Sequence, residues 1–315
     1  MLRRIGRGLA ALVGLGIVLG VIGSFYESAA EAADVTAYPP PGRMVDVGGY
    51  RLHLNCVGTG APTVVIDAGW GDWSAAWSSW VQPEAAKTTR VCTYDRAGMG
   101  WSEPGPLPRT AAHFARELRT LLQRAELPGP YVLVGHSMGG LTVLEFAHAF
   151  AADVAGVVLV DSMSPSGARP AVPPPPPLPA APAGELSIYT LPARVGLVRL
   201  LAGPAMREGL APGLAGAYAA FSVTPRAVQT TLDEGRGMGE SLAQVGAIKS
   251  LGATPLIVLS RGLDPEPDWQ RWQAEFLDLS SRSRQRIAET SGHNIERDQP
   301  SAAIAAIAEI ASLVR

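Results

Sequence analysis

The stretch VLVGHSMGG, residues 132–140, places a serine between two glycines where an apolar strand pattern meets a helical one, LTVLEFAHAF. In a sharp strand-to-helix turn the central residue has a strained backbone, and the residues two positions away must be very small because neighbouring chain passes close by. Gly135 and Gly139 meet that requirement. The turn then holds the Ser137 hydroxyl at the C-terminal edge of a sheet, beside the amide N–H groups that begin the next helix. We therefore predict that Ser137 is a nucleophile.

The flanking sequence alternates strand patterns with helical patterns. Residues 44–49 and 50–58 alternate in polarity and meet at a glycine pair, which predicts a hairpin. Short apolar runs follow at residues 62–69, 90–98, 131–137 and 155–162, and residues 110–127 have helical spacing. Strands that alternate with helices in this way predict an α/β fold with a mostly parallel sheet.

A serine hydroxyl is a weak nucleophile and needs a base. In folds with this turn the chain order is serine, then an acid, then histidine. Two histidines follow Ser137, and His148 lies in the helical stretch after the turn, pointing away from its start. His293 lies between a last strand pattern, RQRIAE, and a C-terminal helix that begins near Pro300. We predict that His293 is the base.

The third member of such a triad orients the imidazole and stabilises its cation. Asp264 is the predicted acid, because it follows the apolar run TPLIVLSRG and precedes a proline, with room for one helix and one strand before His293. Glu266 and Asp268 are nearby alternatives. Asp161, which ends the apolar run AGVVLVD, is the alternative from the preceding strand.

Acyl transfer also needs hydrogen-bond donors for the developing oxyanion. One predicted donor is the backbone N–H of Met138, directly after the nucleophile. The other is the backbone N–H of Trp70, in the glycine-containing loop DAGWGD at residues 67–72. The same loop is also compatible with a turn that has no catalytic task. The tryptophans at positions 70, 73 and 77 are compatible with an acyl pocket and equally with core packing.

Composition excludes several classes of function. Of the 315 residues 47% are hydrophobic and 17% charged, and the net charge is −2, so no basic surplus indicates nucleic-acid binding. The five histidines form no metal-ligand pattern, and we expect neither a metal nor a cofactor. Cys56 and Cys92 are too far apart for a zinc knuckle; a disulfide and two buried thiols both remain open.

The N-terminus has the pattern of a membrane segment. Arg3, Arg4 and Arg7 precede the uncharged run Gly8–Tyr26, whose helix would nearly match a hydrocarbon layer of roughly 30 Å. Basic residues stay in the cytoplasm, so the rest of the chain is expected on the extracytoplasmic side. We predict an uncleaved anchor over residues 1–26 and a linker over 27–43. The alternative is a secretory signal cleaved near Ala30-Glu31-Ala32.

These motifs together resemble those of the α/β-hydrolase family, in its serine hydrolase branch. The similar pieces are VVIDAGWGDWSAAW, YDRAGMGWSEPG, VLVGHSMGG, AGVVLVDS, PLIVLSRGLDP and SGHNIERDQP. The resemblance implies the same roles for Ser137, Asp264, His293, Trp70 and Met138. Many members of the family carry His-Gly where this chain has Ala68-Gly69, so the oxyanion loop is expected to be held differently. The family pattern also implies a structural turn at Asp95-Arg96.

The middle of the chain differs in kind. Residues 173–177 are consecutive prolines, typical of extended chain, and short patterns rich in Ala, Leu and Gly follow. The resemblance implies a helical lid over residues 163–250, inserted into a core of residues 44–162 and 251–315. The apolar residues of this lid suggest a small-molecule acyl substrate with an apolar portion, although they would also serve to pack the lid on the core.

Two classes of function remain. The first is a serine hydrolase that cleaves a carboxylic ester or a related acyl compound through a Ser-His-Asp triad and an acyl-enzyme. An amidase or peptidase of the same fold belongs to this class. The second is a ligand-binding member without catalysis. An aspartate nucleophile, as in the epoxide-hydrolase branch of the family, is disfavoured because position 137 is serine.

Overall fold

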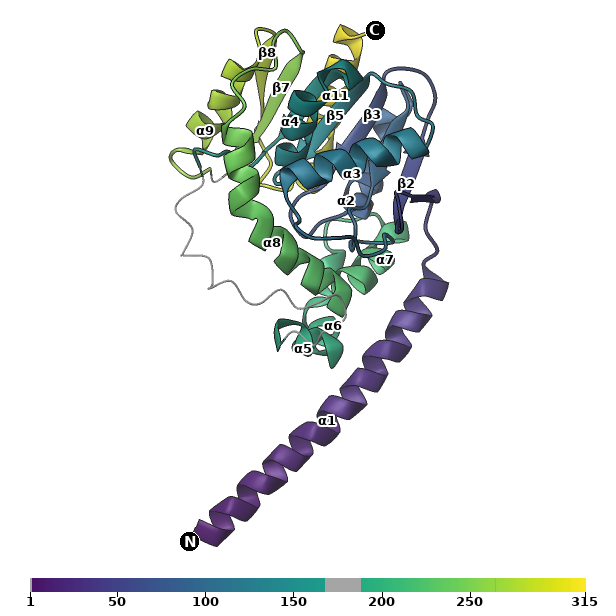
Figure 1. The fold of residues 1–315 in the computed structure, drawn as a ribbon, viewed down its shortest axis with the longest axis vertical. Coiled ribbons are helices and arrows are strands. Elements are labelled where there is room, and N and C mark those ends of the chain that lie inside the picture. Colours follow the sequence, from purple (N-terminus) through teal and green to yellow (C-terminus); the bar gives the residue numbers. More distant parts are fainter. Residues whose placement is uncertain (1, 168–187, 264) are drawn as a thin grey trace.

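Eight strands form one sheet, in the order β1-β2-β4-β3-β5-β6-β7-β8, in a computed structural model that describes residues 2–167, 188–263 and 265–315 (Figure 1). The strands are β1 (Arg43–Asp46), β2 (Arg51–Val57), β3 (Thr63–Asp67), β4 (Val91–Tyr94), β5 (Tyr131–His136), β6 (Val154–Val160), β7 (Leu256–Arg261) and β8 (Ser283–Ala288). The pairs β1–β2 and β2–β4 are antiparallel, and every other pair is parallel. The predicted mostly parallel α/β sheet is confirmed.

The predicted hairpin at the start of the domain is present. Strands β1 and β2 pair with Val45 opposite Leu52, and Gly48 and Gly49 make the turn with φ of 115° and 106°. Such angles lie in the region that glycine adopts without steric cost, which is why the glycine pair stands there.

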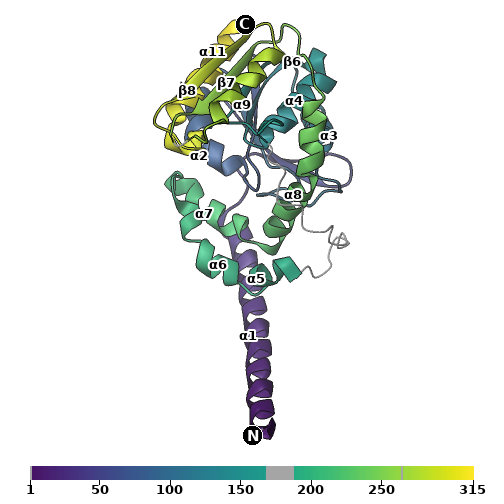
Figure 2. The ribbon, with the colours of Figure 1, turned by 90° about the vertical axis from the view of Figure 1, so that its left-hand side faces the viewer.

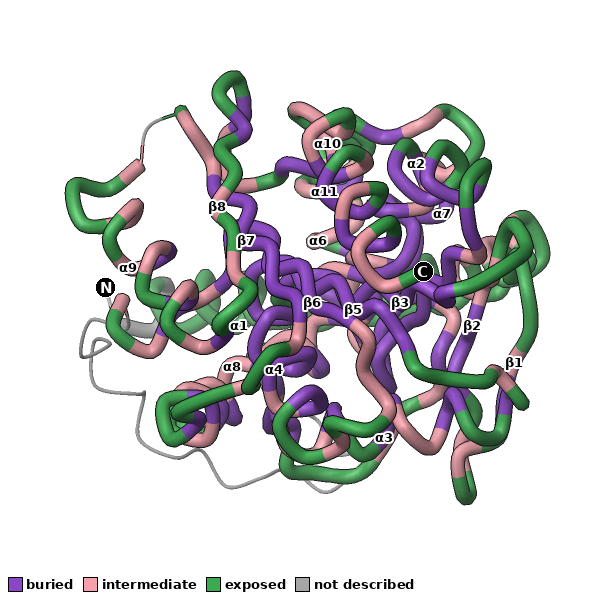
Figure 3. Tube along the Cα trace, turned by 90° about the horizontal axis from the view of Figure 1, so that it is seen from above, coloured by how far each residue is buried: buried purple, intermediate pink, exposed green. Residues whose placement is uncertain are grey.

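Helices cover both faces of the sheet, as Figure 3 shows from above. One face carries α3 (Ala111–Arg124), α4 (Gly139–Ala149) and α8 (Pro225–Gly246), whose apolar side chains share a core with Leu133 and Val258 of the sheet. The other carries α2 (Ser74–Ala85) and α11 (Pro300–Leu313), packed with Val134 and Val160. Because both faces are buried, the central strands are continuous apolar runs rather than alternating ones.

The two cysteines form a disulfide. Cys56 on β2 lies directly opposite Cys92 on β4, and their sulfurs are bonded. The structure thus decides between the two possibilities that the sequence left open. A disulfide of this kind persists in oxidising compartments.

The N-terminal helix is longer than its apolar run. Helix α1 (Leu2–Ala37) continues past Tyr26 through most of the expected linker, and it ends before Tyr38 and three prolines. Proline lacks the N–H that a helix interior needs, which accounts for the stop. Residues 5–37 are long and apolar enough to cross a membrane, and the apolar window has no buried residue. Figure 1 shows α1 projecting from the domain.

The region expected to be a lid is helical where the structure describes it. It contains η2 (Ile188–Thr190), α5 (Leu191–Arg194), α6 (Leu197–Ala202), η3 (Ala205–Arg207), α7 (Pro212–Ser222) and α8. The proline run at 173–177 lies outside the described residues. Figures 1 and 2 place α5 and α6 at the end of the domain from which α1 projects. The remaining elements are η1 (Ala151–Asp153), α9 (Trp269–Glu275), η4 (Phe276–Leu279) and α10 (Ile295–Asp298).

Candidate active site

Ser137 occupies the sharp turn between β5 and α4. Its φ of 49° lies in the left-handed region, which an L-residue adopts only when its surroundings enforce it. A Cβ on Gly135 would lie 2.5 Å from the Gly139 carbonyl oxygen, and a Cβ on Gly139 would lie 2.5 Å from the Asp67 carbonyl oxygen. Real Cβ atoms do not come that close to backbone. The two glycines that drew attention in the sequence are therefore sterically required.

The structure brings Ser137, His293 and Asp161 together. His293 Nε2 lies 3.0 Å from Ser137 Oγ, and His293 Nδ1 lies 2.6 Å from Asp161 Oδ2. Ser137 follows β5, Asp161 follows the neighbouring strand β6, and His293 stands in the loop after β8. All three strands are parallel, so their C-terminal ends meet at one edge of the sheet. The Asp161 side chain is buried, whereas that of His293 is 40% exposed and accessible to a substrate.

Four hydrogen bonds hold the Asp161 carboxylate. Oδ1 accepts from the Arg261 backbone N–H at 3.0 Å and from Trp269 Nε1 at 2.7 Å, while Oδ2 accepts from Arg261 Nη1 at 2.9 Å and from His293. Burial alone would raise the pKa of Asp161, but the hydrogen bonds from His293 and Arg261 bring it below its ordinary value. The carboxylate is therefore ionised, as orientation of a histidine requires.

Asp264, the residue predicted to be the acid, lies outside the described residues. The hydrogen bond expected of it, at His293 Nδ1, is made by Asp161, which sequence reasoning had kept as the alternative from the preceding strand. Of the nearer alternatives, Asp268 pairs with Arg271 on the surface. Asp161 stands at the end of β6, which lies between β5 and β7, so its carboxylate is one strand away from Ser137.

His136 holds the loop that carries His293, a contact that the sequence did not predict. Its Nε2 donates to the His293 carbonyl oxygen at 2.9 Å. Burial and the nearby His293 lower the pKa of His136 to about 3, so the ring is neutral. Its Nδ1 faces Gly69, where a Cβ would lie 3.1 Å away. Asp298 secures the other side of the loop by accepting from the Gly292 backbone N–H at 3.0 Å.

The loop that carries Trp70, one of the two predicted oxyanion donors, lies beside Ser137. A Cβ built on Gly69 would lie 3.5 Å from the Ser137 Cβ, so the loop after β3 closes over the turn. The backbone N–H groups of Trp70 and Met138 donate no hydrogen bond to any group in the part of the chain that the structure describes. Two free donors near a serine suit an oxyanion. The Trp70 indole instead extends away, donating to the Thr231 carbonyl oxygen at 2.8 Å.

Arg96 holds the loop after β3, which the Ala68-Gly69 departure from the family pattern led us to expect to be held differently. Its guanidinium donates to the carbonyl oxygens of Ala68 at 2.7 Å and Gly69 at 2.6 Å, and to Asp67 Oδ1 at 2.6 Å. Glu234 of α8 accepts from Arg96 Nε at 2.7 Å and, through its other oxygen, from the Gly71 backbone N–H at 3.1 Å. The buried turn network expected at Asp95-Arg96 therefore extends to the lid.

The other two tryptophans of the series are core residues. Trp73 is 1% exposed and Trp77 is fully buried. Trp73 stacks on Tyr218 of α7, with ring centroids 5.3 Å apart, and its indole N–H donates to Ser222. Trp70, by contrast, is 52% exposed. Core packing thus accounts for Trp73 and Trp77 but not for Trp70.

A cluster of buried groups lies behind the catalytic histidine. Asp72, His136 and Glu296 bring ligand-type atoms within 4.8 Å of one another. Burial, and the neighbouring Asp72, raise the pKa of Glu296 to about 8, so this carboxyl keeps its proton at neutral pH. The His136 Nε2 proton is engaged with His293. A protonated acid and an occupied nitrogen suit a structural cluster better than a cation site, because metal ligands must be deprotonated.

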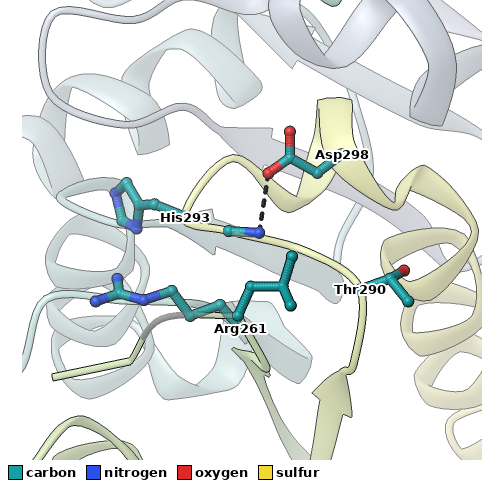
Figure 4. Close-up of a pocket in the computed structure, with 6 residues that line it drawn as sticks. Arg261, Thr290, His293 and Asp298 are labelled. Carbon is teal, nitrogen blue, oxygen red and sulfur yellow. Dashed lines mark hydrogen bonds between the residues drawn. The ribbon is translucent and has the colours of Figure 1, made fainter. Parts of the chain in front are cut away.

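An open hollow of about 750 Å³ lies against His293 (Figure 4). Arg261, Leu263, Thr290, Gly292, His293 and Asp298 line it. In Figure 4 the side chains of His293 and Arg261 extend in the same direction from neighbouring segments, and the dashed line marks the Gly292–Asp298 bond. A small-molecule substrate could therefore reach the imidazole from this side.

A parallel sheet with a serine at a strand-to-helix turn, and a histidine and an acid at neighbouring strand ends, defines a class of hydrolase folds. The model of the alpha/beta hydrolase family matches residues 57–307, and the chain belongs to that family. The family resemblance and the α/β-hydrolase fold expected from the sequence are both confirmed.

Several known proteins are similar to this chain. The uncharacterized protein YqjL of Bacillus subtilis is 28% identical over 249 residues, which cover 77% of this chain and 81% of that protein. The probable transporter efuK of Hormonema carpetanum is 34% identical over 127 residues, 38% of this chain, and the match spans only 18% of that much longer protein. An uncharacterized vacuolar membrane protein of Saccharomyces cerevisiae is 31% identical over 131 residues, 36% of this chain and 19% of its own length.

Solved structures share the fold. A thermophilic esterase from Thermogutta terrifontis superposes with a TM-score of 0.63 and 22% identity, covering 86% of this chain and 98% of that one. The epoxide hydrolase CorEH superposes with a TM-score of 0.63 and 18% identity, covering 87% and 99%. At these identities the likeness shows the fold alone, so the chemistry must be argued from the residues.

Proposed function

We propose that this chain is a serine hydrolase that cleaves a carboxylic ester through Ser137, His293 and Asp161. The observation that carries the proposal is the continuous hydrogen-bonded series from Ser137 Oγ to His293 Nε2 and from His293 Nδ1 to Asp161. Asp161 thereby replaces Asp264 as the proposed acid. The Met138 and Trp70 backbone N–H groups are the proposed oxyanion donors.

The geometry supports the following chemistry. With Nδ1 protonated and donating to Asp161, His293 presents an unprotonated Nε2 to Ser137 and takes the hydroxyl proton as Oγ attacks the ester carbon. The proton then passes to the departing alcohol, and an acyl-enzyme remains. Water attacks this acyl group with His293 again as the base, which releases the acid and restores Ser137. Each oxyanion donor typically contributes about 2.7–4 kcal/mol of transition-state stabilisation.

The proposed substrate is a small acyl compound with an apolar portion, because the sequence of the proposed lid is rich in apolar residues. We propose an ester as the substrate class, and an amidase or peptidase of the same fold is the alternative. A ligand-binding protein without catalysis is the remaining alternative. It is disfavoured because a buried ionised acid, a histidine and a serine in hydrogen-bonding order serve no evident purpose in binding alone.

We also propose that α1 is an uncleaved membrane anchor with the catalytic domain on the extracytoplasmic side. The Cys56–Cys92 disulfide fits an oxidising compartment. Glu27 and Asp34 of α1 pair with Arg199 of the proposed lid at 2.8 Å and 2.7 Å. Cleavage near Ala32 would separate Glu27 from the domain, so the domain is better stabilised with α1 intact. The alternative is secretion after that cleavage.

Turnover of activated esters tests the enzymatic proposal. We expect the full chain in detergent to hydrolyse p-nitrophenyl esters, and Ser137→Ala to reduce the rate to background with an unchanged circular dichroism spectrum. Ser166→Ala, at an exposed serine outside the site, is the matched control and should keep full activity. Hydrolysis by Ser137→Ala at the wild-type rate would contradict the proposed nucleophile. A series of acyl lengths from acetate to octanoate would then define the apolar preference.

A further inference from the structure

The lid carries an exposed apolar surface at the base of the domain. We call it the α5–α6 surface; its large side chains, with their exposed fractions, are Ile188 (75%), Tyr189 (47%), Leu191 (50%), Leu197 (45%), Leu200 (61%) and Leu201 (74%). Such a concentration within one short segment is unusual for a surface that faces only water, and contiguous apolar patches commonly mark an interaction site.

Helix α1 packs directly against the same segment. A Cβ on Gly23 would lie within 3.1 Å of the Val195 backbone, and one on Gly196 would lie 2.7 Å from the Tyr26 ring, so the two backbones approach closely. Glu27, which is 1% exposed, accepts two hydrogen bonds from Arg199, and Asp34 accepts a third. These contacts fix the α5–α6 surface to α1. Figures 1 and 2 show the arrangement from two sides.

The length of α1 determines where the α5–α6 surface would lie relative to a bilayer that α1 crosses. Gly8 to Gly23 spans about 22 Å of helix, and Gly8 to Tyr26 about 27 Å, at 1.5 Å per residue. A hydrocarbon layer is about 30 Å thick. If it begins at Arg7, it therefore ends close to the point where α1 first touches Val195 and Gly196. The apolar side chains of α1 before that point, such as Val18 and Ile22, are more than half exposed and have no protein partner in the described residues.

Aromatic residues mark the same level. Phe25 (75% exposed) and Tyr26 (45%) lie where the uncharged run of α1 meets the lid, with the Tyr26 ring against Gly196. Tyrosine is enriched at membrane–water interfaces, where its ring is amphipathic. Exposed leucines next to such a belt are the pattern of an interfacial helix, whose apolar face enters the boundary between headgroups and acyl chains.

We propose that the α5–α6 surface is seated in the lipid interface of the bilayer that α1 crosses, so that the lid of this hydrolase is itself a membrane-bound element. The proposal rests on the proposed anchoring by α1. Its partner is a phospholipid bilayer, because the anchor leads directly to the surface and its hydrophobic length ends there. A second copy of the chain is the competing occupant.

The test uses the full chain in phosphatidylcholine vesicles with one nitroxide label per variant. The native cysteines are bonded, so Leu200→Cys and Leu201→Cys each offer a single thiol. Ile287→Cys is the matched control: Ile287 is also exposed (44%) but stands on β8, away from α1. Val18→Cys reports on the anchor. The accessibility of each label to oxygen, which dissolves in lipid, is compared with that to a water-soluble nickel complex. Unchanged ester turnover of the labelled variants confirms folding.

We expect oxygen to be favoured severalfold at positions 18, 200 and 201, and the nickel complex at 287. Oxygen preference at 18 with nickel preference at 200 and 201 would overturn the inference and leave the anchor intact. Nickel preference at 18 would overturn the anchor and the inference together. Low accessibility to both reagents at 200 and 201 would indicate protein contact, as in a dimer, and would also overturn it. Ester turnover is measured independently of all three outcomes.

Discussion

Asp161 and Glu296 are buried carboxyls that the fold holds in opposite protonation states. Four donors bring the pKa of Asp161 below its ordinary value, whereas Glu296 is buried near Asp72, and its pKa is raised to about 8. Neither Glu296 side-chain oxygen has a hydrogen-bond partner in the described residues. The ionised Asp161 suits the proposed role of orienting His293.

The raised pKa of Glu296 predicts a pH dependence of stability. The folded chain holds this proton more tightly than the unfolded chain, whose carboxyl has the ordinary pKa of 4.5. The free energy of unfolding should therefore fall as pH rises from 4.5 to about 8, because the unfolded chain releases this proton first. Glu296→Gln should remove this contribution, so urea unfolding of wild type and variant at several pH values across the same interval checks it.

The exposed Glu275→Gln is the control for that comparison, and it should leave the slope with pH unchanged. The low pKa of His136 gives wild type and variant alike an opposite slope, between pH 3 and 6.5, so the difference between the two proteins isolates Glu296. Parallel curves for wild type and Glu296→Gln would show that Glu296 is ionised in the fold.

The positions of Ser137 and His293 were predictable because local patterns enforce them. Gly135 and Gly139 predicted the turn at Ser137, and the strand pattern RQRIAE predicted a loop at His293. The acid was harder to assign, because both Asp161 and Asp264 follow apolar strands. Only the fold shows that Asp161 reaches His293 at 2.6 Å. Arg261 and Trp269, which hold that acid, carried no sequence signal at all.

At the scale of elements, α8 links the lid to the oxyanion loop. Glu234 on α8 holds Arg96, which holds the carbonyl oxygens of Ala68 and Gly69, and the same carboxylate accepts from the Gly71 N–H. The Trp70 indole adds a further bond to α8. The lid is thus a structural support of the loop that carries a proposed oxyanion donor.

Glu234→Gln tests this support. The substitution keeps the shape of the side chain but removes the charge that pairs with buried Arg96, so the loop should lose its fixed position. We expect kcat/KM for a short ester to fall at least about tenfold, which corresponds to about 1.4 kcal/mol of transition-state stabilisation. Asp233→Asn, one residue away, should change it little, because Asp233 pairs with Arg236 and accepts from Gln229 of the same helix. Equal activities of the two variants would mean that the loop does not depend on α8.

The sequence predicted the strongly periodic elements. It did not predict the contacts that they make with residues far away in the chain. The hairpin, the apolar strands and helix 110–127 were all expected close to where they occur. The extension of α1 to Ala37 was not, because its stabilising contact, Arg199, lies far along the chain. The Arg96–Glu234 pair is equally remote in sequence. Such pairs become visible only when the sheet and lid place them together.

At the scale of the whole molecule, helix α1, the helical insertion and the sheet that carries Ser137 form one connected series. Helix α1 is bound to the lid through Arg199, the lid to the oxyanion loop through Glu234, and that loop closes over Ser137. A membrane-bound lid would place the proposed ester hydrolysis next to a source of amphiphilic substrates. The proposed ester hydrolysis requires that Ser137 be an activated nucleophile.

Labelling by a fluorophosphonate, read by intact mass, tests that claim most directly. The probe forms a covalent adduct only with a serine whose hydroxyl a base activates. We expect one adduct on the wild-type full chain and none on Ser137→Ala. Asp161→Asn should slow labelling strongly, up to about 10⁴-fold, through the wrong histidine tautomer, and Asp264→Asn should label at nearly the wild-type rate. No adduct on folded wild type, or slow labelling in Asp264→Asn alone, would contradict the Ser137–His293–Asp161 assignment.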